Sequence, residues 1–279
     1  MCVPIMNNAR GNARAWAHYE SLRTAAGAVS IGLADRGIQA VFVKGIVSAR
    51  RLYDDPIERP MSDIDVRVTS AELMRVPAIA KTLGWQKVHD VPSYGAQSYL
   101  VGGQLVELEC FLGPPYFSKW SIEELRARAH PVTDLGNAEA ICLEPDWHDQ
   151  VLISVLNAVK DKLATAFPYS IEDVRRYLRA TDTDPIRLHA LAKSRGIEAA
   201  LCAAVHWVGA LDADVACLDR QIPWSPSANL RGRGFVRVAR SDPRGVSARV
   251  AMRLLGSPQL WPQAAIAVMS RAMLPPATK

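Results

Sequence analysis

The pattern of apolar residues changes part-way along this chain and divides it into two parts of different kinds. Up to the Pro114-Pro115 pair, short apolar runs typical of strands alternate with helical patterns. From about Asp146 onward the pattern is helical almost throughout. Short strands mixed with helices predict a small α/β (α+β) domain with a mixed sheet, and the second part predicts an all-helical domain.

The length and composition fit two ordinary folded domains. The chain has 279 residues, of which 49% are hydrophobic and 22% are charged, a balance that supports a real core. The change of pattern places the join between Pro131 and Pro145. We therefore predict a first domain over residues 1–140, with an N-terminal helix, and a helical domain over residues 141–279.

Turn residues and periodicity predict the individual elements. Gly37 and Gly84 end helices, Ser70 begins one, and Gly102-Gly103 is a tight turn between strands. The expected strands cover residues 39–44, 63–68, 85–91, 97–101 and 104–112. The expected helices cover residues 13–36, 46–53, 70–83, 149–166, 170–179, 185–194 and 197–211.

Charge and cysteine content narrow the class of protein only slightly. The formal net charge is +5 and the pI about 9.0, which fits a polyanionic ligand such as a nucleotide or RNA but is shared by many enzymes. The five cysteines are scattered and form no Cys-x-x-Cys pair, so no zinc site or disulfide framework is indicated. Without an apolar stretch of about 20 residues or a signal peptide, we expect a cytoplasmic protein with no membrane partner.

The strongest local signal is a pair of carboxylates on one strand. Asp63 and Asp65 are two residues apart, so their side chains lie on the same strand face, roughly 6.6 Å apart along the strand. The strand over residues 104–112 offers Glu107 and Glu109 in the same relation. Acids that face acids repel one another unless cations lie between them, so the pattern indicates a site for Mg²⁺. A solvated strand face is the alternative.

A longer stretch around these acids resembles a known family. Residues 41–68 read VFVKGIVSARRLYDDPIERPMSDIDVRV. The order Lys-Gly, Leu-Tyr, Arg-Pro and Ser-Asp-Ile-Asp resembles the uncharacterised nucleotidyltransferase family of the DNA polymerase β-like superfamily. The resemblance continues more weakly to about Trp207. At 106–109 the chain has Val-Glu-Leu-Glu, where the family usually has Val-Asp-Leu-His, which leaves open which glutamate takes the acidic role.

The resemblance implies a fold and a set of ligands. It implies a polymerase β-like catalytic domain followed by a helical domain, with a nucleotide between them. Asp63 and Asp65 would bind Mg²⁺, or Mn²⁺ as the alternative, with Glu107 or Glu109 as a third ligand. The residues implied for binding a nucleoside triphosphate are Lys44, Gly45, Ser48, Arg59 and Ser62. The superfamily commonly has Gly-Gly or Gly-Ser where this chain has Gly45-Ile46, so phosphate contacts would shift to Ser48 or Arg59.

The implied reaction is transfer of a nucleoside monophosphate to an acceptor with release of pyrophosphate. Three alternatives remain open: an enzyme that modifies RNA or tRNA in the manner of a toxin, an enzyme acting on a small molecule or peptide, and a sensor or scaffold that binds nucleotide without catalysis. Four intact acids argue against the last. The acceptor, the choice of nucleotide and the oligomeric state are not indicated by the sequence.

A segment rich in arginine follows in the second part. Residues 231–253 contain seven arginines and one acid, Asp242. Gly232, Gly234 and Gly245 predict that much of it is flexible, and Phe235 could stack on a base. The segment predicts RNA binding, with a solvated face or arginines that line the nucleotide site as the alternatives.

Overall fold

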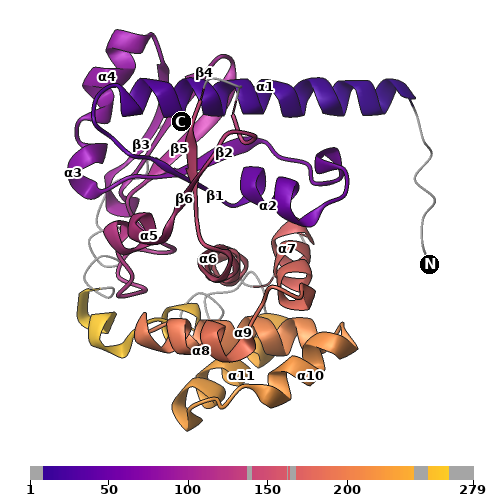
Figure 1. Cartoon of the computed structure of the whole chain (residues 1–279). Coiled ribbons are helices and arrows are strands. Elements are labelled where there is room, and N and C mark those ends of the chain that lie inside the picture. The colour runs from indigo at the N-terminus through magenta and orange to yellow at the C-terminus, as the bar shows by residue number, and fades with distance from the viewer. Residues whose placement is uncertain (1–8, 137–139, 162, 164–167, 242–250, 264–279) are drawn as a thin grey trace. The chain divides into compact units, whose positions relative to one another are not determined.

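The computed structural model describes residues 9–136, 140–161, 163, 168–241 and 251–263 (Figure 1). These residues form two compact units whose ranges interleave along the chain. The first contains the chain up to Asp90 together with Ala96–Glu109 and Ala129–Glu144. The second contains Val91–Gly95, Cys110–Arg128 and the chain from Pro145 onward. The predicted boundary at residues 140 and 141 stays a prediction.

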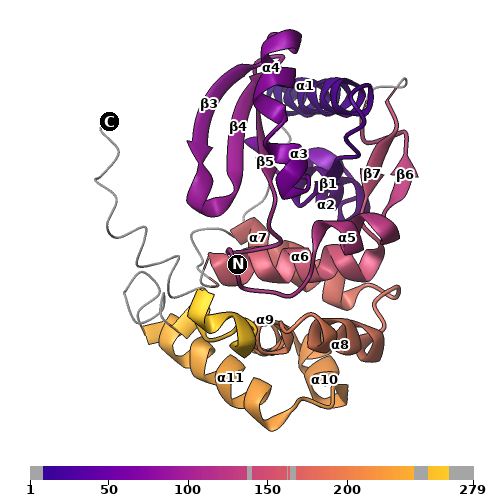
Figure 2. The ribbon, with the colours of Figure 1, turned by 90° about the vertical axis from the view of Figure 1, so that its left-hand side faces the viewer.

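The first unit is built on a seven-stranded sheet in the order β3-β4-β5-β2-β1-β7-β6 (Figures 1 and 2). β1 is antiparallel to β2 and parallel to β7, while β2 is parallel to β5. The predicted mixed sheet is therefore confirmed. The strands are β1 Val41–Val43, β2 Asp63–Arg67, β3 Gln86–Val91, β4 Ala96–Val101, β5 Gln104–Glu109, β6 His130–Val132 and β7 Cys142–Glu144.

Alternation along the two central strands separates apolar from acidic side chains. Ile64 and Val66 on β2 are fully buried, as are Val106 and Leu108 on β5. Successive side chains of a strand point to opposite faces of the sheet. The burial of these four residues therefore leaves the acids of both strands together on the other face.

Helices of the first unit pack on the sheet. α1 (Ala9–Ala34) lies across the strands and α2 (Gly45–Leu52) follows β1 directly (Figure 1). The predicted single helix over 70–83 is wrong, because it forms two helices, α3 (Ser70–Leu73) and α4 (Val76–Leu83). Pro77 lacks the backbone N–H that a continuous helix would need there.

The predicted cap of that helix is also wrong by one residue. Thr69, not Ser70, is the N-cap of α3, and its hydroxyl accepts from the backbone N–H of Glu72. The Glu72 carboxylate in turn accepts from the Thr69 N–H, which completes a capping box. Such reciprocal bonding satisfies two N–H groups at the helix start, so Thr69 is favoured as the cap over Ser70.

The second unit is helical in the part that the structure describes, as predicted. α9 is its centre: every residue from Glu198 to Val205 is buried. It is contacted by α6, α7, α8, α10 and α11. None of the described helices is long and apolar enough to cross a membrane. The helices are α5 Ile122–Arg128, α6 Trp147–Lys160, α7 Pro168–Arg179, α8 Pro185–Ser194, α9 Glu198–Gly209, α10 Ala213–Gln221 and α11 Pro226–Ser241, and the short 3-10 turns of the chain are η1 Pro56–Glu58, η2 Pro92–Tyr94 and η3 Pro258–Leu260.

The start of the arginine-rich segment is ordered, contrary to the prediction. α11 is a continuous helix through Gly232 and Gly234. Gly232 is buried against α9, where a β-carbon would lie 2.9 Å from the Ala199 carbonyl oxygen. Phe235 is only 2% exposed, so the prediction that it stacks on a base is wrong. Arg244, Gly245 and Arg249 lie outside the described residues.

Candidate active site

Three predicted acids meet on one face of the sheet. β2 and β5 are parallel neighbours, and their register places Asp65 directly opposite Glu107. Asp63 precedes Asp65 by two residues on the same face of β2. Asp65 is 7% exposed, while Asp63 and Glu107 are half-buried. The site is therefore a partly desolvated group of carboxylates at the centre of the sheet.

Burial, and next to it mutual repulsion, makes Asp63 and Glu107 harder to ionise. Burial raises the pKa of the Asp63 carboxyl, and the nearby charge of Asp65 raises it further. Burial also raises the pKa of Glu107, with added repulsion from Asp65 and Asp63. Repulsion of this kind is relieved when a cation binds between the carboxylates.

Lys44 supplies one positive charge to this group. Its Nζ donates to Asp65 Oδ1 at 2.5 Å. Burial lowers the pKa of the Lys44 ammonium, but the charges of Asp65 and Glu109 outweigh that effect and the pKa is raised overall. Lys44 also has a φ of 57° at the junction of β1 and α2, a conformation that is uncommon for residues other than glycine. The turn therefore directs a fully charged lysine at Asp65.

The fourth predicted acid has a different partner. Arg67 is 2% exposed, lies two residues after Asp65 on β2, and donates from Nη2 to Glu109 Oε2 at 2.5 Å. Its Nη1 is 4.0 Å from Asp65 Oδ1. The charge of Glu109 is thus balanced by a buried arginine that the sequence pattern did not single out.

The turn before α2 brings the predicted phosphate-binding residues together. A β-carbon on Gly45 would lie 2.9 Å from Arg59 Nη1 and 3.1 Å from the Met61 side chain, so Arg59 lies against the start of α2. The positive charge of Arg59 offsets a small part of the rise in the pKa of Asp63. Ser62 donates from Oγ to Asp63 Oδ1 at 3.3 Å. Ser48, by contrast, is fully buried.

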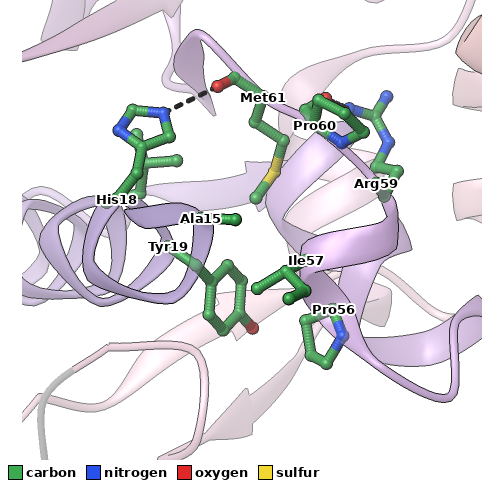
Figure 3. Close-up of a pocket in the computed structure, with 9 residues that line it drawn as sticks. Ala15, His18, Tyr19, Pro56, Ile57, Arg59, Pro60 and Met61 are labelled. Carbon is green, nitrogen blue, oxygen red and sulfur yellow. Dashed lines mark hydrogen bonds between the residues drawn. The ribbon is translucent and has the colours of Figure 1, made fainter. Parts of the chain in front are cut away.

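A pocket of about 110 Å³ lies between α1 and the loop over residues 56–61 that leads into β2 (Figure 3). His18 of α1 bonds through Nε2 to the Met61 carbonyl oxygen at 2.8 Å. Tyr19, Ile57 and Met61 point toward one another in the pocket (Figure 3). No local sequence pattern indicated that α1 holds this loop, because the two segments are 43 residues apart.

Comparison with known proteins identifies the family. The sequence profile of a family described as uncharacterised nucleotidyltransferase matches residues 10–211. The chain belongs to this nucleotidyltransferase family. The resemblance predicted from residues 41–68 is therefore confirmed, and so is the general class of reaction, nucleotide transfer. A search of curated protein sequences found no match.

Solved structures similar to this nucleotidyltransferase are distant. The antibiotic-resistance factor ANT(2'')-Ia is 13% identical, with a TM-score of 0.40 over 84% of this chain and 99% of that chain. A tRNA-processing enzyme in its first apo form is 12% identical, with a TM-score of 0.31 over 88% of this chain and 77% of that chain. Its second apo form is 11% identical, with a TM-score of 0.30 over 88% and 81%.

The carboxylates of this nucleotidyltransferase suit a hard divalent cation by their chemistry. In the described part of the chain, no three His, Cys, Asp or Glu side chains are arranged closely enough to form a metal site by themselves. Asp63, Asp65 and Glu107 nevertheless offer only oxygen donors, which Mg²⁺ prefers. Burial, with added repulsion from the neighbouring carboxylates, raises the pKa of both Asp63 and Glu107, even with the Lys44 charge nearby. The donor set therefore fits Mg²⁺, with further oxygen ligands to come from outside the chain.

Proposed function

We propose that this nucleotidyltransferase is a Mg²⁺-dependent enzyme that moves a nucleoside monophosphate from a nucleoside triphosphate to an acceptor. The observation that carries the proposal is the pairing of Asp65 and Glu107 across β2 and β5, beside Asp63. Family membership supplies the reaction class, and the pairing supplies a place where that chemistry can occur.

Asp63, Asp65 and Glu107 would hold the cation, with Mn²⁺ as a substitute. A divalent ion held by these residues would neutralise charge on the phosphate oxygens and lower the pKa of the acceptor group. Glu107 is preferred over Glu109 as the third ligand, because Arg67 already binds the Glu109 carboxylate.

The cationic residues of the turn would bind the triphosphate. Gly45 begins α2 with the Arg59 guanidinium close beside it, and helix N-termini favour anions. Lys44 and Arg59 add positive charge at the same turn, and Ser62 adds a hydroxyl donor. Ser48 is left out of this set because it is fully buried.

The transfer itself needs a proton acceptor. An acceptor hydroxyl oxygen attacks the α-phosphorus and forms the new P–O bond, while the bond to the bridging oxygen of the β-phosphate breaks and pyrophosphate leaves. The proton of the hydroxyl would pass to a carboxylate, and Glu107 is the proposed acceptor because it lies beside Asp65 on the neighbouring strand.

Incubation with each of four α-labelled nucleoside triphosphates and Mg²⁺ tests the proposal. Total tRNA and a small-molecule extract serve as acceptors, and pyrophosphate release is measured in parallel. Asp65→Asn should abolish both label transfer and pyrophosphate release. Asp90→Asn, an exposed acid on β3 of the same sheet, should leave both unchanged. Full activity of Asp65→Asn would rule out the assignment of this site.

A further inference from the structure

The outer face of α11 carries a row of arginines. Arg233, Arg237 and Arg240 are exposed, and their spacing of four and three residues places them on one side of the helix. The opposite side, with Ala228, Gly232, Phe235, Val236 and Ala239, is buried. Figure 2 shows α9 between α6 and α11, so α11 is an outer helix of its unit.

Close packing fixes the direction in which this row points. At Gly232 a β-carbon would lie within about 3 Å of backbone atoms of α9, namely 2.9 Å from the Ala199 carbonyl oxygen and 3.0 Å from the Ala203 nitrogen. Helices that approach so closely cannot rotate freely against one another. The arginine row is therefore a rigid feature of the surface and not a flexible arm.

The arginines of α11 differ in what they do. Arg231 donates from Nη1 to the carbonyl oxygens of Leu254 and Gly256, at 2.8 and 3.0 Å, and so holds the following chain segment. Arg233 donates to Asn229 and lies 3.6 Å from Asp219 Oδ2, which balances part of its charge. Arg237 and Arg240 remain as the main source of positive charge in the row.

Arg240 also makes a cation–π contact. Its guanidinium carbon lies 5.1 Å from the ring centroid of Trp207, a half-buried residue of α9. A guanidinium plane held over an aromatic ring offers its other face to a further planar group, such as an unpaired base. The helix has no acid and no lysine, and arginine binds phosphate through two parallel hydrogen bonds where lysine acts as a point charge.

We propose that the α11 row, Arg233, Arg237 and Arg240 with Trp207, binds single-stranded RNA. The arginines contact backbone phosphates, and the Trp207 side chain beside Arg240 receives an unpaired base. Unpaired bases at loops and ends are the parts of RNA that proteins stack on most readily. The proposal rests on the proposed function in one point, because an RNA end can be the acceptor only if the protein transfers a nucleotide.

Fluorescence anisotropy of the full chain with a labelled RNA of 12 unpaired nucleotides, without nucleotide, tests the binding. The test variant is Arg237→Gln with Arg240→Gln. The matched control, Arg187→Gln with Lys193→Gln, removes two exposed charges from α8 of the same unit. Removing two phosphate contacts should weaken binding about tenfold and reduce the slope of log affinity against log salt by roughly 1.4. The control should keep the wild-type affinity and slope.

Several results would overturn the proposal. These are no RNA binding by the wild type at low salt, an equal loss in the α8 control, or displacement of the RNA by polyglutamate as effectively as by unlabelled RNA, which would indicate an acidic protein partner. Asp65→Asn should bind RNA like the wild type. Absent RNA binding together with label transfer to a small molecule would reject only the α11 proposal, whereas RNA binding without any transfer would reject only the proposed reaction.

Discussion

At the scale of single residues, the candidate site contains more carboxylates than positively charged side chains to pair with them. Lys44 bonds to Asp65 and Arg67 bonds to Glu109, while the pKa values of Asp63 and Glu107 stay raised. The spacing of two residues correctly predicted that Asp63 and Asp65 share one face of a strand, while their role in a metal site stays a prediction. It did not predict Arg67 as a partner of Glu109, since cross-strand register decides that pairing.

Lys44 can be tested apart from its unusual backbone. Lys44→Met should reduce nucleotidyl transfer by about 10²–10³-fold, the loss typical when one donor that stabilises transition-state charge is removed. Lys44→Gly can adopt the positive φ without strain. It should lose as much activity as Lys44→Met, because it too lacks the ammonium group. Lys87→Met on β3, which removes an exposed lysine, is the control. Steady-state pyrophosphate release is the measurement, and wild-type rates in Lys44→Met would contradict the role.

The two glutamates of β5 should respond in opposite ways to the same substitution. Glu107→Gln should abolish transfer and leave stability nearly unchanged. Glu109→Gln should leave Arg67 buried without its carboxylate and lower the free energy of unfolding by about 2–3 kcal/mol. Urea denaturation and the transfer assay measure both effects. Adding Arg67→Met to Glu109→Gln should recover part of the stability, since the pair is coupled; a Glu109→Gln protein that is stable but inactive would instead make Glu109 the third ligand.

At the scale of elements, the sequence predicted β1 to β5 but gave no bounds for β6, β7, α5, α10 or α11. It also misjudged the glycines. Gly84 ends α4 in a left-handed conformation, as expected of a helix terminator. Gly232 and Gly234 were interpreted as signs of flexibility, yet both lie within α11. A glycine in a sequence can mark either a flexible segment or a position where two helices pack closely. For Gly232 only the position of α9 shows that close packing is the reason.

The two glycines of α11 therefore predict opposite effects of one substitution. Gly232→Ala should destabilise the protein by about 1–3 kcal/mol, because the new methyl group meets backbone atoms of α9 that cannot shift cheaply. Gly234→Ala meets nothing within 4 Å and should stabilise the protein by about 0.5–1 kcal/mol through higher helix propensity. Urea denaturation of both variants is the measurement; equal effects would mean that α11 does not pack on α9 through Gly232.

At the scale of the whole molecule, the family resemblance predicted the order of a mixed-sheet unit and a helical unit. It could not predict that the units interleave in sequence, with residues 129–144 returning to the first unit after 110–128 have joined the second. That return adds β6 and β7 to the sheet edge beside β1. Three-residue strands such as these are too short to give a period-two signal.

Ligand binding should affect the two units unequally, because the proposed nucleotide residues all belong to the first. With Mg²⁺ and a non-hydrolysable nucleoside triphosphate, amide hydrogen exchange should slow in α2 and β2, since a ligand protects the segments whose opening it opposes. Chelation of the metal with EDTA should remove most of this protection, as should Asp65→Asn, while the Asp90→Asn control should retain it. Protection that persists in Asp65→Asn with EDTA present would mean that the nucleotide binds without the carboxylate site, and the turn at Lys44 and Gly45 would then act as a metal-independent anion site.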